Sequence, residues 1–422
     1  MSKVMKSIGV WGLQRFWITL LSLLPSIGVY SQDVHAQDVY EQKTDNAEGV
    51  VEIPWPDCVT TKIDSMLETD PLLETSQLGL MVYDLTDDVT LYTYNHQQTM
   101  RPASTMKLVT AITTLNHLDG NHQLKTSLRY TGEICNRTLR GNLYCVGGMD
   151  PLFDITDLRD FVTILREHEI DTIRGCIISD CSMKDELKWG EGWCWDDDNP
   201  TLSALLIGGK ANFTDRFISE LTSAGVVLDS VTIFEDYTPS DAITLTTCHH
   251  NLDQVLLPMM KESNNLYAEC AFFQLATTFG YRPARASYAR TLEKQLVSSL
   301  GLQPNSYRFA DGSGLSLYNY VSPELLTTLL RYAWRTPRIY QHLLPTLPIA
   351  GEDGTLKKRM KKTAAEGNVK AKTGTLTGII SLAGYLTAAN GHELAFTIIN
   401  QGVMSAKGAR EFQDRLCAIL CQ

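Results

Sequence analysis

Two residues that can do chemistry together, Ser104 and Lys107, stand three positions apart in the stretch RPASTMKLVTAITTLNHL at 101–118. Apolar residues recur every three positions from Met106 to Leu115, which predicts a helix with a buried stripe. Residues three apart share one face of a helix, so the hydroxyl and the amine could point into one pocket. Such a pair also arises by chance, and only further motifs can decide whether it is catalytic.

Two more short motifs give this pair a context. Ser263 and Asn265 form an S-x-N within KESNNLYAE, at the junction of two predicted helices. Lys372, Thr373 and Gly374 form a K-T-G within AKTGTL, on a predicted strand that leads into a C-terminal hairpin. Each motif is weak alone. Their order, with S-x-x-K on a helix, S-x-N between helices and K-T-G on a strand, is the signature of serine acyltransferases that react with penicillin.

The nucleophile requires a base and a place for the developing negative charge. A serine hydroxyl such as that of Ser104 reacts poorly until a nearby base takes its proton. Lys107 can be that base if its pKa falls, and we expect the charge of Lys372 to lower it. The backbone N–H groups of Ser104 and Thr375 would form the oxyanion hole, which is usually the largest electrostatic contribution.

The remaining motif residues suit proton transfer and substrate binding. Ser263 can relay the proton to the leaving amine, while the amide of Asn265 holds the peptide carbonyl of the substrate. Lys372 and the hydroxyl of Thr373 offer a charge and a hydrogen bond to a terminal carboxylate. We expect Gly374 to leave room for an acyl chain against the strand.

Beyond the three motifs, the chain from about 75 to 420 resembles the class C low-molecular-mass penicillin-binding proteins, which are D-alanyl-D-alanine carboxypeptidases and endopeptidases. The resemblance includes GGMDPLF at 147–153, GWCWDD at 192–197, FADGSGLSLYNYVSP at 309–323 and AGEDGTLKKRM at 350–360. It implies a β-lactamase-like transpeptidase fold with modules inserted between the first two motifs. It also implies that peptidoglycan stem peptides are the substrate and that β-lactam antibiotics are inhibitors.

Two departures from the family pattern carry expectations of their own. Many members hold two nested modules, but the 108–262 segment is short enough that we predict one. Members often have arginine where this chain has Leu317, and that arginine helps to read a diaminopimelate side chain. Asp150, which the family pattern retains, would read the amine of the third stem residue. We therefore expect similar cleavage of lysine-type and diaminopimelate-type stems. The alternative role for Asp150 is a cap on the helix that follows.

The pattern of elements predicts an α+β protein whose antiparallel sheet is flanked by helices. Strand-like runs separated by Ala389-Asn390-Gly391 predict a C-terminal hairpin, because Asn-Gly is a strong turn signal. The segments 37–124 and 246–422 together form the predicted transpeptidase-like domain. Residues 125–245 change character to short strands, a helix and an acidic aromatic loop, which predicts one inserted α+β module.

The N-terminus has the pattern of an export signal. Three basic residues precede FWITLLSLLPSIGVYS, an uncharged run too short for a comfortable membrane span. We predict a signal peptide at 1–31, with cleavage after 36 as a second choice, and a location in the periplasm or cell envelope. An uncleaved membrane anchor is the competing interpretation. Without residues 1–31 the charge is 34 basic against 48 acidic residues, which disfavours nucleic acid as a partner.

The ten cysteines suit an oxidising compartment but are too dilute to be the main stabiliser of the fold. Cys135 with Cys145, or Cys176 with Cys181, could close a disulfide. Neither C-x-x-C nor H-E-x-x-H occurs, and the adjacent histidines at 249–250 are interpreted as surface residues, so we predict no metal and no cofactor. The oligomeric state is left open.

Two other functions fit parts of this pattern. A β-lactamase shares the fold and the acylation step, but it would need a dedicated carboxylate for deacylation, and the sequence offers no convincing loop for one. A non-catalytic peptidoglycan-binding scaffold would not need a nucleophile, a base and a carboxylate anchor. The main hypothesis is therefore a serine DD-peptidase that acts through an acyl-enzyme on Ser104. Carboxypeptidase and endopeptidase activities remain equally compatible with the sequence.

Overall fold

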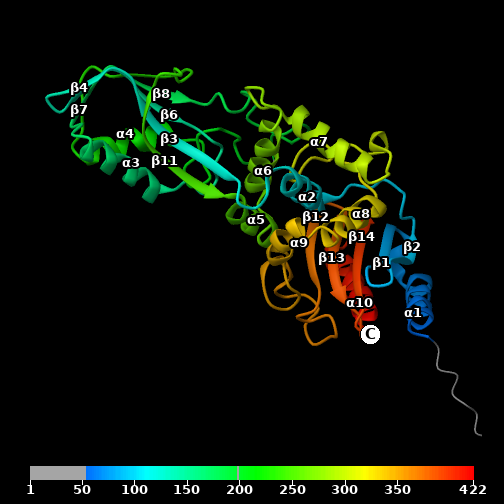
Figure 1. The fold of residues 1–422 in the computed structure, drawn as a ribbon. Helices are drawn as coiled ribbons and strands as arrows, with labels where there is room; N and C mark the ends of the chain where they lie inside the picture. Colours follow the sequence, from blue (N-terminus) through cyan, green and yellow to red (C-terminus); the bar gives the residue numbers. More distant parts are fainter. Residues whose placement is uncertain (1–53, 197–198) are drawn as a thin grey trace, which may run out of the picture. The chain divides into compact units, whose positions relative to one another are not determined.

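The computed structural model describes residues 54–196 and 199–422 (Figure 1). The predicted signal peptide at 1–31 lies outside the described residues. No helix in the described part of the chain has both the length and the apolar character needed to cross a membrane.

A five-stranded antiparallel sheet forms the centre of the predicted transpeptidase-like domain. Its strands follow the order β12 (Lys370–Leu376), β13 (Ile379–Thr387), β14 (Glu393–Gln401), β1 (Gln77–Asp84) and β2 (Val89–Tyr94). The predicted C-terminal hairpin is confirmed as β13 and β14, and the chain from 77 to 94 forms a second hairpin.

Helices cover both faces of this sheet, which explains why its central strands are buried along almost their whole length. Along β1, Leu78, Leu80 and Val82 face a core shared with α1 (Trp55–Thr69) and α10 (Ala406–Leu420). Met81 and Tyr83 belong instead to a larger core with six other helices. These helices are α2 (Met106–Leu118), α5 (Leu252–Lys261), α6 (Asn265–Thr277), α7 (Ala286–Ser299), α8 (Pro323–Trp334) and α9 (Pro337–Leu343). The period of two along β1 thus separates two cores.

Two further sheets are built wholly from residues 123–251, the segment that contains the predicted module at 125–245. One has the order β10 (Thr232–Glu235), β8 (Cys176–Asp180), β6 (Leu143–Val146), β3 (Gln123–Tyr130) and β11 (Ile243–Asn251). The other has the order β4 (Glu133–Cys135), β5 (Thr138–Arg140), β7 (Thr172–Arg174) and β9 (Val227–Leu228). Two helices, α3 (Ile155–Glu167) and α4 (Phe213–Ser223), pack on them around a separate phenylalanine-rich core. These sheets and helices, with their own core, lie between the first two motifs in the chain.

All ten cysteines lie in the described residues, and all ten are free thiols in this structure. Neither Cys135 with Cys145 nor Cys176 with Cys181 forms the disulfide that the spacing allowed.

Candidate active site

Ser104 lies in a single 3₁₀ turn, Ala103–Thr105, directly before α2. Ala103 has a left-handed backbone, with φ of 48°, and is buried. Side chains tie the turn to the sheet, because the hydroxyls of Thr105 and Ser381 both donate to the carbonyl of Pro102, at 2.7 and 2.6 Å. A sparsely populated backbone conformation held by several contacts is typical of a functional position.

Lys107 lies one turn later on α2, as the spacing predicted, and its side chain is fully buried. Its Nζ donates to Ser104 Oγ at 3.0 Å, to Asn265 Oδ1 at 2.7 Å and to the Ser313 carbonyl at 2.7 Å. All three acceptors are uncharged, so the amine has hydrogen bonds without a counter-ion in direct contact.

Burial lowers the pKa of Lys107 to about 7, while the more distant charges of Asp311 and Glu269 oppose the shift. Desolvation penalises the charged amine, and neutral acceptors do not compensate for it fully. We expected the charge of Lys372 to lower this pKa, but burial is the cause. Burial is also the main cause that lowers the pKa of Lys372 well below its usual value, and the neighbouring charge of Lys107 adds to that shift.

The S-x-N motif lies in the loop between α5 and α6, as predicted from the sequence. Ser263 has a left-handed backbone with φ of 61°, and its hydroxyl accepts from Lys372 Nζ at 2.8 Å. Asn264 is the N-cap of α6 and accepts from the Tyr267 N–H at 3.4 Å. The cap fixes the first helical residue, Asn265, whose side chain reaches Lys107.

Strand β12 brings the K-T-G motif to the opposite side of the nucleophile. Lys372 is fully buried and also donates to the Thr373 carbonyl at 2.7 Å. The Thr373 hydroxyl donates to Thr355 Oγ1 at 2.7 Å, and Thr375 is exposed. Alternation along the strand therefore buries the lysine and leaves the threonine hydroxyls near the surface.

Gly374 has a different role from the one expected. A Cβ at this position would lie 2.1 Å from Ser381 Oγ, 2.8 Å from the Pro102 carbonyl and 2.9 Å from the Ser104 nitrogen. The space beside Gly374 is thus filled by the nucleophile turn, and no room for an acyl chain remains there. The glycine instead lets β12 pass close to the Ser104 N–H, next to Thr375.

Two groups near the site were missed by sequence reasoning. Arg410 of α10 is partly buried, and its Nη2 donates to Thr375 Oγ1 at 3.3 Å. No local pattern marks an arginine that lies 35 residues after the K-T-G motif. Thr355, which bonds Thr373, falls in the AGEDGTLKKRM segment that carried part of the family resemblance.

The loop that follows Phe309 is a second missed component. Asp311 accepts from the backbone N–H groups of Gly314 and Ser316, both at 2.8 Å, and from Trp193 Nε1 at 2.7 Å. These bonds fix the carbonyl of Ser313 against Lys107. The segments that contain Trp193 and Asp311 both carry part of the family resemblance. Only the contact between these two residues shows that the segments position the Ser313 carbonyl.

A buried carboxyl group supports the same loop from α6. Glu269 Oε1 accepts from the N–H groups of Gly312 and Ser313, at 3.1 and 2.9 Å. Burial raises the pKa of Glu269 to about 8. The carboxyl groups nearest to Lys107 are therefore engaged by the loop backbone.

Asp150 does not match either of its expected roles. Its side chain is fully buried: Oδ1 accepts from the Leu152 N–H at 3.0 Å, and Oδ2 lies 2.7 Å from His250 Nδ1. Such a carboxylate is not available to a substrate amine. It is not the cap of the following helix either, because Asp154 is the N-cap of α3. The contact with His250 therefore determines where the Asp150 side chain lies.

A cavity of about 740 Å³ opens beside the S-x-N motif. Asn265 lines it from α6, and Pro151, Leu152 and Asp154 line it from the loop that precedes α3. Asp154 is exposed, in contrast to Asp150. This hollow can accept a peptide whose carbonyl reaches Asn265 and whose side chain extends toward the module.

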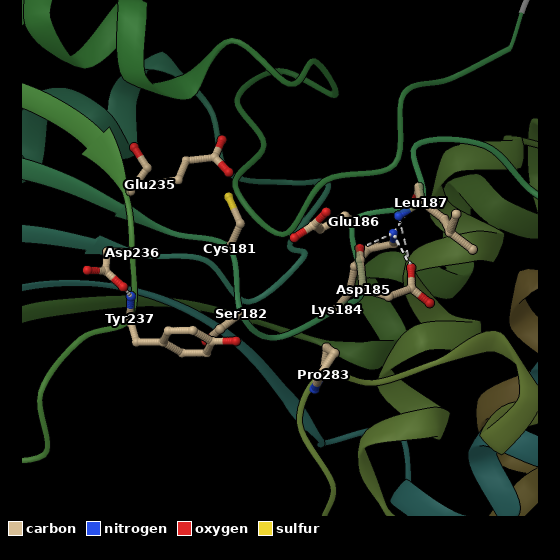
Figure 2. A pocket seen from close by; sticks show the side chains of 11 residues that line it. Cys181, Ser182, Lys184, Asp185, Glu186, Leu187, Glu235, Asp236, Tyr237 and Pro283 are labelled. Atoms are coloured by element: carbon tan, nitrogen blue, oxygen red, sulfur yellow. Dashed lines mark hydrogen bonds and ion pairs between the residues drawn. The ribbon is translucent and has the colours of Figure 1, made fainter.

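A second cavity, of about 420 Å³, has an acidic lining that includes Asp185, Glu186, Glu235 and Asp236 (Figure 2). Lys184 Nζ lies there 3.0 Å from Asp185 Oδ1 and also donates to two backbone carbonyls. None of the lining residues belongs to the three motifs. This acidic cavity is therefore not part of the candidate active site.

Comparison with known proteins places this geometry in a family. The chain is 28% identical to a D-alanyl-D-alanine carboxypeptidase of Actinomadura sp. strain R39, with 81% of this chain and 80% of that protein covered. It is 27% identical to the D-alanyl-D-alanine carboxypeptidase DacB of Haemophilus influenzae, with 78% and 86% covered.

Solved structures show the same fold. The crystal structure of penicillin binding protein 4 from Haemophilus influenzae matches with a TM-score of 0.79 and 23% identity, over 85% of this chain and 99% of that one. A peptidoglycan endopeptidase from Bdellovibrio bacteriovorus matches with a TM-score of 0.55 and 15% identity, over 82% and 92%. The family model described as D-Ala-D-Ala carboxypeptidase 3 (S13) matches residues 59–206 and 208–422. With the serine and lysine of its first motif in contact and this match along nearly all described residues, the chain belongs to the S13 family of serine peptidases, the class C low-molecular-mass penicillin-binding proteins.

Proposed function

We propose that the protein is an exported serine DD-peptidase that hydrolyses the bond after D-alanine in peptidoglycan stem peptides through an acyl-enzyme on Ser104. The observation that carries the proposal is the hydrogen bond of 3.0 Å between the buried Lys107 amine and Ser104 Oγ. An amine with a pKa of about 7 is partly unprotonated at neutral pH and can accept the hydroxyl proton.

The acylation step follows from the arrangement of these groups. Lys107 takes the proton of Ser104 as Oγ attacks the carbonyl carbon of the penultimate D-alanine. The N–H groups of Ser104 and Thr375 stabilise the oxyanion, since Gly374 lets β12 approach the nucleophile turn. When the peptide C–N bond breaks, Lys107 gives up the proton that it took from Ser104. This proton reaches the leaving amine through Ser263, which Lys372 holds by its hydrogen bond of 2.8 Å.

Deacylation returns the enzyme to its starting state. A water molecule loses a proton to Lys107 as it attacks the ester carbonyl. The ester C–O bond then breaks, and Ser104 recovers its proton. A β-lactam would enter the same path through opening of its amide bond, and the acyl-enzyme would be retained.

Substrate binding uses both sides of the nucleophile. Asn265 holds the peptide carbonyl beside the 740 Å³ cavity, which takes the preceding stem residues. The Thr373 hydroxyl and Arg410 face the terminal carboxylate, while Lys372 is fully buried and holds Ser263. Because Asp150 is buried, we do not assign it to the third stem residue; the exposed Asp154 is the carboxylate that lines the cavity.

The position of Leu317 bears on the third stem residue as well. Arg101 Nε donates to the Leu317 carbonyl at 3.0 Å, so a cation lies beside the residue that replaces the family arginine. Arg101 is the candidate for the carboxylate of a diaminopimelate stem. Comparing lysine-type with diaminopimelate-type stems on wild type and Arg101→Ala measures this contribution.

Fluorescent penicillin labelling, peptide mass mapping and a D-alanine release assay test the proposal together. A DD-peptidase gives a stable adduct on Ser104 and releases D-alanine, and Ser104→Ala abolishes both. A β-lactamase turns penicillin over rapidly without D-alanine release, and a binding scaffold gives neither signal. An adduct on any other residue would overturn the mechanism. Digestion of defined muropeptides, with and without cross-links, then measures carboxypeptidase against endopeptidase activity.

A further inference from the structure

Three potential metal ligands meet in the inserted module, away from the three motifs. One ligand atom each from Asp157, Cys248 and His250 lies within 4.8 Å of the other two. Cys248 and His250 stand two positions apart on β11, so both side chains point to the same face of the strand. Asp157 comes from the first turn of α3, which contacts β11. All three are partly buried, whereas His249 between them is exposed.

The fourth residue, Asp150, orients the histidine. Its Oδ2 lies 2.7 Å from His250 Nδ1, and its other oxygen accepts from the Leu152 N–H. This pairing leaves Nε2 as the free ring nitrogen. A histidine that binds a metal commonly donates its other N–H to a carboxylate, which fixes the ring and makes it a better ligand. This role explains why a fully buried aspartate has a histidine as its side-chain partner.

The charges around the cluster favour a cation. The carboxylate of Asp157 accepts from the Asp154 N–H through Oδ2, at 2.8 Å, and is also a hydrogen-bond partner of the Cys248 thiol. Asp160 and Asp150 add negative charge near Cys248. Among the described residues, no lysine or arginine makes an ion pair with Asp157 or Asp150.

We propose that Asp157, Cys248 and His250 bind one Zn²⁺, with Asp150 as the carboxylate that orients His250. A thiolate, an imidazole and a carboxylate suit zinc, whereas magnesium and calcium prefer oxygen ligands alone. Three protein ligands leave one tetrahedral position for water. The ion joins α3 to β11 directly behind the loop whose Pro151 and Leu152 line the substrate cavity.

Cobalt provides the test, because Co²⁺ bound by a thiolate has a charge-transfer absorption that oxygen and nitrogen ligands do not produce. The full-length mature protein is reduced, stripped with a chelator and titrated with Co²⁺. We expect one thiolate-bound Co²⁺ per chain, displaced by one equivalent of Zn²⁺. Cys248→Ser removes the absorption. Cys176→Ser, a partly buried cysteine of the same module outside the cluster, retains it.

Further variants separate the zinc site from adventitious binding and from misfolding. Asp150→Asn should weaken Zn²⁺ binding by roughly 10–100-fold without changing the number of sites. Asp157→Asn, which can still cap α3, should weaken binding as well. Each variant is accepted as folded only if its rate of penicillin acylation matches wild type. Absence of the thiolate absorption in wild type, or its persistence in Cys248→Ser, overturns the proposal. The proposal would also be overturned if the metal were bound only by a second cluster, which consists of Asp84, Asp87 and His392.

Discussion

Two buried lysines occupy different regions of this molecule, and their partners differ in charge. Lys107 in the active site is fully buried and donates only to a hydroxyl, an amide oxygen and a carbonyl. Lys184 in the inserted module is 3% exposed and donates to the Asp185 carboxylate and to two carbonyls, with its amine 4.8 Å from the centre of the Phe273 ring.

The difference shows how one residue type can serve as a base or as a structural cation. Neutral acceptors orient the Lys107 amine without compensating the loss of hydration, so its pKa falls to about 7. The amine of Lys184 instead contacts a carboxylate and an aromatic face. Burial alone therefore does not identify a catalytic lysine; the charge of its contacts does.

The largest effect is expected from replacing Lys107 by arginine. Lys107→Arg keeps the charge but removes the proposed base, because arginine stays protonated at any workable pH. Acylation by penicillin should slow by roughly 10²-fold or more. Lys184→Arg, the matched control, should acylate at the wild-type rate. Stopped-flow labelling measures both. Lys107→Arg acylating within tenfold of wild type would contradict the role of Lys107 as base.

The second prediction concerns pH. The reactive form of Lys107 is unprotonated, so the acylation rate should rise with pH and level off above its pKa of about 7. Below that pH the rate should fall about tenfold per unit, as the fraction of neutral amine falls. The Lys184→Arg variant should give the same profile. A rate independent of pH between 5 and 7 would exclude a titrating lysine base.

The third prediction tests whether Arg410 binds the terminal carboxylate of the substrate. Arg410→Ala should lower kcat/KM about tenfold for stem peptides with a free terminal carboxylate, because one charge-assisted contact contributes roughly 1.5–3 kcal/mol. Peptides with an amidated terminus should lose little. Arg415, on the same helix, pairs with Asp70 and gives a matched control in Arg415→Ala. Equal losses on both peptides would mean that Arg410 only stabilises the fold.

The smallest effect on activity is expected at Lys184. Lys184→Met leaves Asp185 without its partner, and the free energy of unfolding should fall by about 1–3 kcal/mol. Acylation by the folded enzyme should remain at the wild-type rate. Chemical denaturation and labelling measure the two quantities on one preparation. A loss of acylation at unchanged stability would assign Lys184 to the active site after all.

Much of the fold and the centre of the site followed from local patterns. The stripe from Met106 to Leu115 identified α2, and Asn-Gly identified the terminal hairpin, since helix period and turn chemistry are local properties. S-x-x-K lies at the start of a helix, S-x-N at a helix junction and K-T-G on a strand. In the structure, hydrogen bonds connect the side chains of these three motifs.

Other features depended on contacts between distant segments. The sequence suggests that Asp150 binds a substrate amine, but in the structure its carboxylate pairs with His250, 100 residues away. Gly374 appeared to leave space that the nucleophile turn occupies. Arg410 and the cluster at Cys248 carry no local signature at all, because a lone arginine or cysteine acquires meaning only from what packs against it.

The sequence by itself thus determined the elements, the order of the motifs and the candidates for nucleophile and base. Periodicity and short spacing encode these properties directly. The tertiary structure alone decided the burial of Lys107 and the charge of its partners, which carboxylates face solvent and which residues form the module cluster. Burial and the charge of through-space neighbours set those properties, and neither can be read from adjacent positions along the chain.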